Sequence, residues 1–293
     1  MASHRNRRRS GARRPFAGGG RAGPLRRRRR RRGAPAGRLW LAVPVLVVAL
    51  GLAAALSSRP AGPPRLFLGV DHQRSFRNAI DGGLPAAVSD ALELCIRASC
   101  DLSADGLTAD TVASASLPVR GVLAVPDGVA EGAARERVID ELAQRRAEEL
   151  LADLPTDPDG TCTDVIGGFL LAESALRSAP GDGARNILML TDGVSNCGRW
   201  DVLAATTTEQ ATETFLAELD RNDMIPDLTD VEVRIAGGAR SADTSPSGAA
   251  GGDPARGEQL QRFWRLYLQR AGANLPVDWW SPRVPDTSLA GVS

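Results

Sequence analysis

Short apolar runs alternate along the chain with segments whose apolar positions recur at helical spacing. The apolar runs at residues 66–70 and 186–190 predict buried strands, and the alternating Val, Val and Ile of residues 231–236 predict a further strand. Helical spacing marks the segments 84–99, 134–154, 165–177, 208–219 and 258–271. Strands that alternate with helices in this way predict an α/β fold, with a doubly wound, mostly parallel sheet flanked by helices over residues 65–280.

The stretches between these segments are less regular. We interpret residues 111–125 as two short strands forming an edge hairpin, because Pro118 and Gly121 lie in their middle. Residues 275–279 predict a last strand, 239–257 a mobile loop and 281–293 a frayed tail. The helix at 134–154 is expected to bury one apolar side, and the last helix to pack its aromatic residues on the sheet. The residues concerned are Val138, Leu142, Leu150 and Leu151 in the first helix, and Phe263, Trp264 and Tyr267 in the last.

The first 56 residues have a different composition. Residues 1–38 contain 15 Arg and no acidic residue, and residues 39–56 are 18 consecutive uncharged residues. We expect a disordered cytoplasmic tail at 1–38, a transmembrane helix at 39–56 and a linker at 57–64, with the rest of the chain outside the cytoplasm. The alternative is a cleaved signal peptide, for which Ala53–Ala55 offer small residues.

The net charge of +1 is the sum of two parts of the chain with opposite charge. Of the 36 basic residues, 15 lie in the tail, so residues 57–293 carry 21 Arg against 35 acidic residues, a net charge of about −14. The tail is expected to contact anionic lipid. A nucleic-acid partner is not expected, because no aromatic residue interrupts the run Arg26–Arg32 to stack on bases.

Oxygen-bearing side chains follow several of the predicted strands and loops. Asp71 comes directly after the first strand, Asp192 follows the strand at 186–190, and Thr163 precedes the helix at 165–177. Ligands of open α/β sheets bind at the carboxyl ends of the strands, where these residues are expected to meet. Carboxylate and hydroxyl oxygens in one place predict a site for a hard cation.

These residues and their order resemble the von Willebrand factor A family and its metal-ion-dependent adhesion site. The family's Asp-x-Ser-x-Ser motif is matched by Asp71 and Ser75, with Gln73 in place of the first Ser, and its later Thr and Asp-Gly elements by Thr163 and Asp192. The resemblance implies a binding module without catalytic residues. The implied cofactor is a divalent cation, Mg²⁺ in preference to Ca²⁺ or Mn²⁺, and the implied partner a protein that offers an acidic group.

Four cysteines lie beyond the predicted membrane segment, where the oxidising environment favours disulfides. The expected fold brings Cys162, beside Thr163, and Cys197, five residues after Asp192, to the same sheet edge, which predicts a Cys162–Cys197 disulfide. The remaining pair, Cys95–Cys100, cannot close within a continuous helix. The helix is therefore expected to end near Ala98 or Ser99. A zinc site is not expected, because the only His beyond the tail is His72.

Two other functions remain open. The chain could be a structural or envelope-assembly protein that uses the same fold without a metal. It could also be an extracellular hydrolase, since His72 lies between Asp71 and Ser75. Three neighbouring residues at one strand tip rarely adopt triad geometry. A second candidate nucleophile is Ser195, but its segment Gly193–Gly198 is one residue longer than the nucleophile-elbow pattern and has no His after it. We therefore expect no enzyme activity.

Overall fold

The computed structural model describes residues 62–73, 76–77, 80, 83–116, 119–155, 162–179, 181–238, 254–286 and 288–289. The predicted tail, the predicted membrane segment and most of the loop predicted at 239–257 lie outside these ranges. Ser75 does as well. Every helix within the ranges is too short or too polar to span a bilayer.

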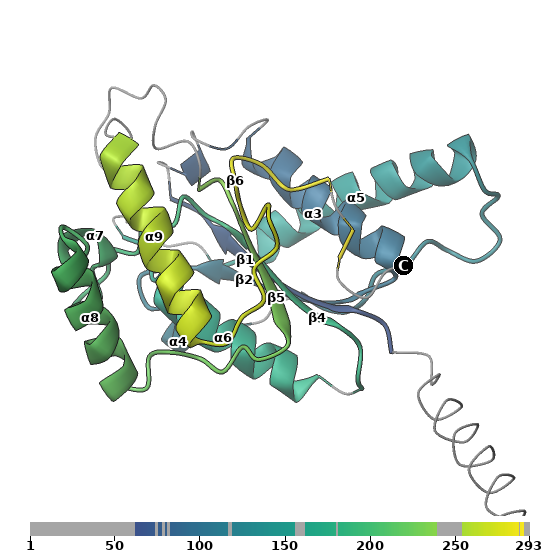
Figure 1. Cartoon of the computed structure of the whole chain (residues 1–293). Helices are drawn as coiled ribbons and strands as arrows, with labels where there is room; N and C mark the ends of the chain where they lie inside the picture. The colour runs from purple at the N-terminus through teal and green to yellow at the C-terminus, as the bar shows by residue number, and fades with distance from the viewer. Residues whose placement is uncertain are drawn as a thin grey trace, which may run out of the picture. The chain divides into compact units, whose positions relative to one another are not determined.

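One sheet of six strands forms the centre of the described part of the chain (Figure 1). Its order is β3-β2-β1-β4-β5-β6; β3 is antiparallel to β2 and every other neighbouring pair is parallel. The strands are β1 Arg65–Asp71, β2 Asp101–Leu107, β3 Val119–Val122, β4 Arg185–Leu190, β5 Val231–Ala236 and β6 Trp280–Ser281. The helices are α3 Leu84–Ala98, α4 Thr111–Ser114, α5 Ala133–Asp153, α6 Val165–Ser178, α7 Val202–Ala205, α8 Glu209–Arg221 and α9 Pro254–Arg270. The predicted mostly parallel α/β sheet is confirmed.

Helices cover both faces of this sheet, and alternate strand residues divide between two cores. Leu66, Leu68 and Val70 of β1 pack with α3 and α5 on one face. Phe67 of β1 packs with α6, α8 and α9 on the other. Figure 1 shows α3 and α5 on one side of the sheet and α6, α8 and α9 on the opposite side. Burial on both faces explains why β1 and β4 read as continuous apolar runs.

The last helix carries the aromatic centre of its core, as predicted. Phe263, Trp264 and Tyr267 are each fully buried, and their rings contact one another at centroid distances of 5.0–5.9 Å. Two expectations about the end of the chain were wrong. The final strand is β6, at Trp280–Ser281, rather than 275–279, and the supposedly frayed tail buries Val284 and Leu289 against the α3 side.

The structure corrects the prediction for residues 111–125. Residues 111–114 form the short helix α4, and the hairpin partner of β3 is β2, a strand that the apolar pattern did not reveal. In α5 the buried positions are Ile139, Ala143, Ala147 and Leu150, so only Leu150 of the four predicted residues is fully buried. Leu142 and Leu151 lie at the margin of the same core, partly buried.

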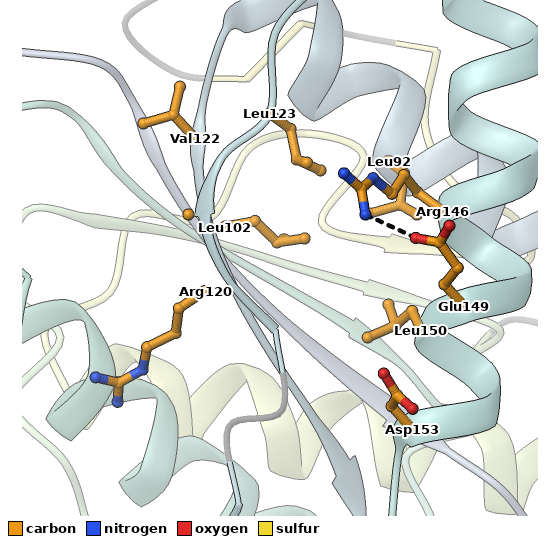
Figure 2. Close-up of a pocket in the computed structure, with 10 residues that line it drawn as sticks. Leu92, Leu102, Arg120, Val122, Leu123, Arg146, Glu149, Leu150 and Asp153 are labelled. Carbon is orange, nitrogen blue, oxygen red and sulfur yellow. Dashed lines mark hydrogen bonds and ion pairs between the residues drawn. The ribbon is translucent and has the colours of Figure 1, made fainter.

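A cavity of about 310 Å³ lies beneath the edge strand β3 (Figure 2). Leu92, Leu102, Leu123 and Leu150 converge on it, and the ion pair between Arg146 and Glu149 lies at its rim. Gly121 pairs with Leu102 across the two strands, and a Cβ added at Gly121 would meet nothing within 4 Å. The missing side chain at Gly121 leaves this end of the sheet loosely filled.

Candidate functional site

The predicted polar residues meet where the chain order of the sheet reverses. Strands β2 and β4 lie on either side of β1, so the gap beyond the carboxyl ends of β1 and β4 is the topological switch point of the sheet. Open α/β sheets bind ligands at this position. Asp71 is the last residue of β1, and Asp192 lies two residues after the end of β4. The two carboxylates thus reach the switch point from neighbouring strands.

Asp71 is the most constrained residue of the site. It is 1% exposed, and its carboxylate accepts hydrogen bonds from the backbone N–H of Gln73 at 2.8 Å, from Thr163 Oγ1 at 3.1 Å and from Thr191 Oγ1 at 3.0 Å. These donors come from three separate segments of the chain. A single carboxylate therefore ties the ends of β1 and β4 to the start of α6.

Burial, and in second place the nearby Asp192 carboxylate, raise the pKa of Asp71 to about 7, against the lowering effect of the three hydrogen bonds. A carboxyl group with a pKa near neutrality holds its negative charge only in part at pH 7. A positive charge placed between the two carboxylates would relieve their repulsion and favour the ionised form of Asp71.

Thr163 is held by a reciprocal pair of bonds with Asn196. The Thr163 N–H donates to Asn196 Oδ1 at 3.0 Å, and the Asn196 N–H donates to the Thr163 carbonyl at 3.2 Å. Cys162, which precedes Thr163, and Cys197, which follows Asn196, form a disulfide. The second predicted disulfide, Cys95–Cys100, is also present, and α3 ends at Ala98 with Ser99 in the left-handed conformation. Both predicted pairings are present in the structure.

Two polar residues that follow Thr163 and Asp192 in the chain have structural roles. Asp164 is the N-cap of α6 and accepts from the Gly167 N–H at 2.8 Å. Ser195 is 1% exposed, and its Oγ accepts from the Val165 N–H at 3.2 Å. A hydroxyl that is buried and bonded to the first turn of α6 is not available as a nucleophile. This geometry does not support the hydrolase alternative at Ser195.

Two tryptophans support the loop that carries Asp192. The Trp264 Nε1–H donates to the Gly193 carbonyl at 2.7 Å. Gly193 has φ +79°, and a Cβ there would lie 2.8 Å from the Trp280 ring and 3.0 Å from Trp264 Nε1. Trp279, the neighbour of Trp280 in the chain, is buried. Only glycine fits between these rings, so the turn after β4 needs Gly193 for its conformation and for its space.

The structure thus brings together Asp71, Gln73, Thr163 and Asp192 of the predicted set, while Ser75 lies outside the described residues. Thr191 and Asn196 also belong to the site. Thr191 could have been found from the sequence, because it directly precedes Asp192 at the end of β4. No sequence pattern marks Asn196, because its role depends on the position of Thr163 before α6. Among the described residues no group of three or more His, Cys, Asp or Glu side chains is placed to hold a metal.

A pH dependence follows from Asp71. Its folded-state pKa is raised from the ordinary 3.8 to about 7, so rising pH across that window costs folding free energy as the buried carboxyl ionises. In EDTA, the Asp71→Asn variant should lose less stability than the wild type between pH 4 and pH 7, because it cannot ionise. Denaturant unfolding at several pH values measures this difference, and parallel profiles for the two proteins would contradict the prediction.

The chain matches no protein-family model, and no curated protein matches it. Among solved structures, it is similar to the open conformation of the pilus adhesin SpaC from Lactobacillus rhamnosus GG. The sequences are 15% identical, the TM-score is 0.38, and the match covers 76% of this chain and 28% of the adhesin chain. This chain therefore corresponds to less than a third of the adhesin's length. The function proposed below rests on the residues of the site.

Proposed function

We propose that the chain is a membrane-anchored, extracytoplasmic binding module of the von Willebrand factor A type, and not an enzyme. A divalent cation at the carboxyl edge of the sheet would capture an acidic group of a partner protein. The observation that carries this proposal is the meeting of two carboxylates, Asp71 and Asp192, with the Thr163 hydroxyl at the switch point of the sheet. Such a set of oxygen donors suits Mg²⁺ in preference to Ca²⁺ or Mn²⁺.

The donor set is compatible with a cation. The Thr163 hydroxyl donates a hydrogen bond to Asp71, which leaves the lone pairs of its oxygen free for a metal. The buried Gln73 Nε2 has no hydrogen-bond partner within the described part of the chain. If the amide group of Gln73 were rotated by 180°, its carbonyl oxygen would occupy the present position of Nε2 and could act as a neutral ligand. Asp71, Gln73, Thr163 and Asp192, with Ser75, would then hold the ion.

Mg²⁺ usually keeps several water molecules when it binds to proteins. A carboxylate from a partner can replace one of them, which is how this module would recognise an acidic group. Residues 57–293 carry a net charge of about −14, so without the cation they would repel such a partner. Recognition is therefore expected to depend on the bound ion.

The second candidate is a structural or envelope-assembly protein that uses this fold without a metal. It is favoured by the three hydrogen bonds that Asp71 already accepts, because they stabilise the site without any cation. The two candidates differ in one measurable property, the response of the folded protein to divalent cations.

Calorimetric titration of the full chain with Mg²⁺, Ca²⁺ and Mn²⁺ tests the proposal. We expect saturable binding of one ion and a rise in melting temperature in millimolar Mg²⁺. Gln73→Ser should bind more tightly than the wild type, because it restores the ligand of the related family. A chain that neither binds these ions nor changes its melting temperature is the result expected of the metal-independent alternative.

A further inference from the structure

A polar hollow lies at the amino ends of strands β1 and β4, opposite the candidate cation site. It has a volume of about 440 Å³ and is lined by the first residues of β1 and β4, the end of α6 and the loop that connects α6 to β4. Its charged residues are Arg65, Arg177, Asp182, Arg185 and Asp230. Arg65 and Asp71 are the two ends of β1, so about 20 Å of strand separates this hollow from the candidate cation site.

Arg65 is a buried cation that forms no ion pair among the described residues, although Asp182 and Asp230 line the same hollow. It is 6% exposed. Its Nη1 donates to the Leu176 carbonyl at 3.2 Å, whereas its Nη2 is buried with no hydrogen-bond partner among those residues. A buried charge and an unpaired buried N–H are each costly to folding. An anion bound to this side chain from the hollow would offset both costs.

Capping of α6 explains only part of this arrangement. Leu176 lies in the last turn of α6, and a cation stabilises the unpaired carbonyls at a helix C-terminus. That role uses Nη1 alone. Nη2 lies beside Gly181, where an added Cβ would come within 3.2 Å of it. The second arm of the guanidinium therefore takes no part in the capping of α6.

Two further arginines line the same hollow. Arg185, at the start of β4, donates from Nη2 to the Thr229 carbonyl at 2.8 Å. Arg177 is exposed and pairs with Glu173 and Asp227. Both add positive charge near Arg65, which Asp182 and Asp230 of the same lining offset in part. A guanidinium group can bind two oxygens of one phosphate through two parallel hydrogen bonds. A carbonyl group has a single oxygen and cannot be bound in this way.

We propose that this hollow binds a phosphate group, with Arg65 as its buried anchor and Arg185 as a second contact. The phosphate could belong to a phospholipid headgroup or be soluble. The lipid source is suggested by the position of Arg65 in the chain, since only the linker 57–64 separates it from the segment predicted to enter the membrane. This site is independent of the cation proposed above.

Thermal unfolding of the full chain in non-ionic detergent tests the proposal, with EDTA present so that the cation site has no part in the result. Inorganic phosphate, or the short-chain lipid dihexanoylphosphatidylglycerol, is added at constant ionic strength, with dihexanoylglycerol as the phosphate-free lipid. At about ten times its dissociation constant, the effective probe should raise the melting temperature by about 3–6 °C. A response to both phosphate probes indicates a general phosphate site, and a response to the lipid alone indicates a headgroup site.

Arg65→Gln keeps a donor for the Leu176 carbonyl and removes the charge, so it should weaken phosphate binding by about tenfold. Arg185→Gln should weaken it several-fold and leaves the buried anchor in place, which covers the case that the Arg65 variant does not fold. Arg137→Gln removes an exposed arginine from α5 and should leave the response unchanged. A wild-type melting temperature insensitive to both phosphate probes would overturn the proposal, and so would equal responses in the wild type and the Arg65 and Arg185 variants.

Discussion

Replacing Asp192 with alanine should abolish divalent-cation binding by the full chain. The substitution removes one of the two carboxylates at the switch point, and at the distance of a direct ligand this loss lowers affinity by at least about 100-fold. It also removes the charge that raises the pKa of Asp71, so that pKa should fall. Calorimetric titration with Mg²⁺ measures the first effect, and NMR titration of the Asp71 carboxyl measures the second.

Two variants separate the charge from the turn. Asp192 Oδ1 accepts from the Val194 N–H at 2.9 Å, and asparagine can keep this bond while it removes the charge. Asp192→Asn should therefore lose the cation as the alanine variant does, but unfold closer to the wild type. Asp220→Ala removes an exposed carboxylate from α8 and should bind Mg²⁺ normally. Unchanged Mg²⁺ affinity in both Asp192 variants would be incompatible with the proposed site.

Removing the Cys162–Cys197 disulfide should lower both stability and cation affinity. The two cysteines are 35 residues apart, and opening a loop of this length costs roughly 4 kcal/mol in the chain-entropy model. Cation affinity should fall because the disulfide flanks the Thr163–Asn196 hydrogen bonds. Denaturant unfolding and Mg²⁺ titration of the Cys162→Ser/Cys197→Ser double variant measure the two effects.

The other disulfide provides the matched control. Cys95 and Cys100 are five residues apart, so their replacement with serine should cost about 2 kcal/mol through the same entropic effect, in addition to any loss of packing. They lie at the end of α3, before β2, whose amino end lies at the sheet edge opposite the candidate site, so Mg²⁺ affinity should not change. Peptide mapping of the non-reduced wild type should recover both pairs. Equal Mg²⁺ affinities in the two double variants would show that the Cys162–Cys197 bond has no influence on the site.

Elements buried on both faces were the easiest to predict from the sequence. β1 and β4 contain continuous apolar runs, and β5 alternates apolar residues with Glu232 and Arg234. Thr208 caps α8 by accepting from the Ala211 N–H. β2 was missed because its sequence contains Asp101, Ser103 and Asp105, residues typical of turns. Asp105 is fully buried yet accepts hydrogen bonds from the Gly106 and Ser116 N–H groups. Its tolerance inside a strand depends on Ser116, which only the folded chain brings near.

The buried face of α5 was misjudged for a related reason. Its centre is Ala143 and Ala147, and these small residues let the helix approach α3 closely. A prediction that follows the larger apolar residues selects the neighbouring face, where Leu142 and Leu151 only border the core. At the candidate site, Asp71, Thr163 and Asp192 were predicted because each directly follows a strand or precedes a helix. The part played by Asn196 depends on the return of the chain beside Thr163, which no local pattern encodes.

The bond between Trp264 and Gly193 gives the molecule an internal optical reporter. The indole is fully buried, and its N–H is hydrogen-bonded to the residue that follows Asp192. Indole emission responds to small changes in the polarity and hydrogen bonding of the ring. A shift of the Asp192 turn therefore has to alter the surroundings of this fluorophore. Because Trp264 belongs to α9, the same shift also affects the packing of that helix. Events at the carboxyl edge of the sheet can in this way be followed by light emitted from the core, with no label attached.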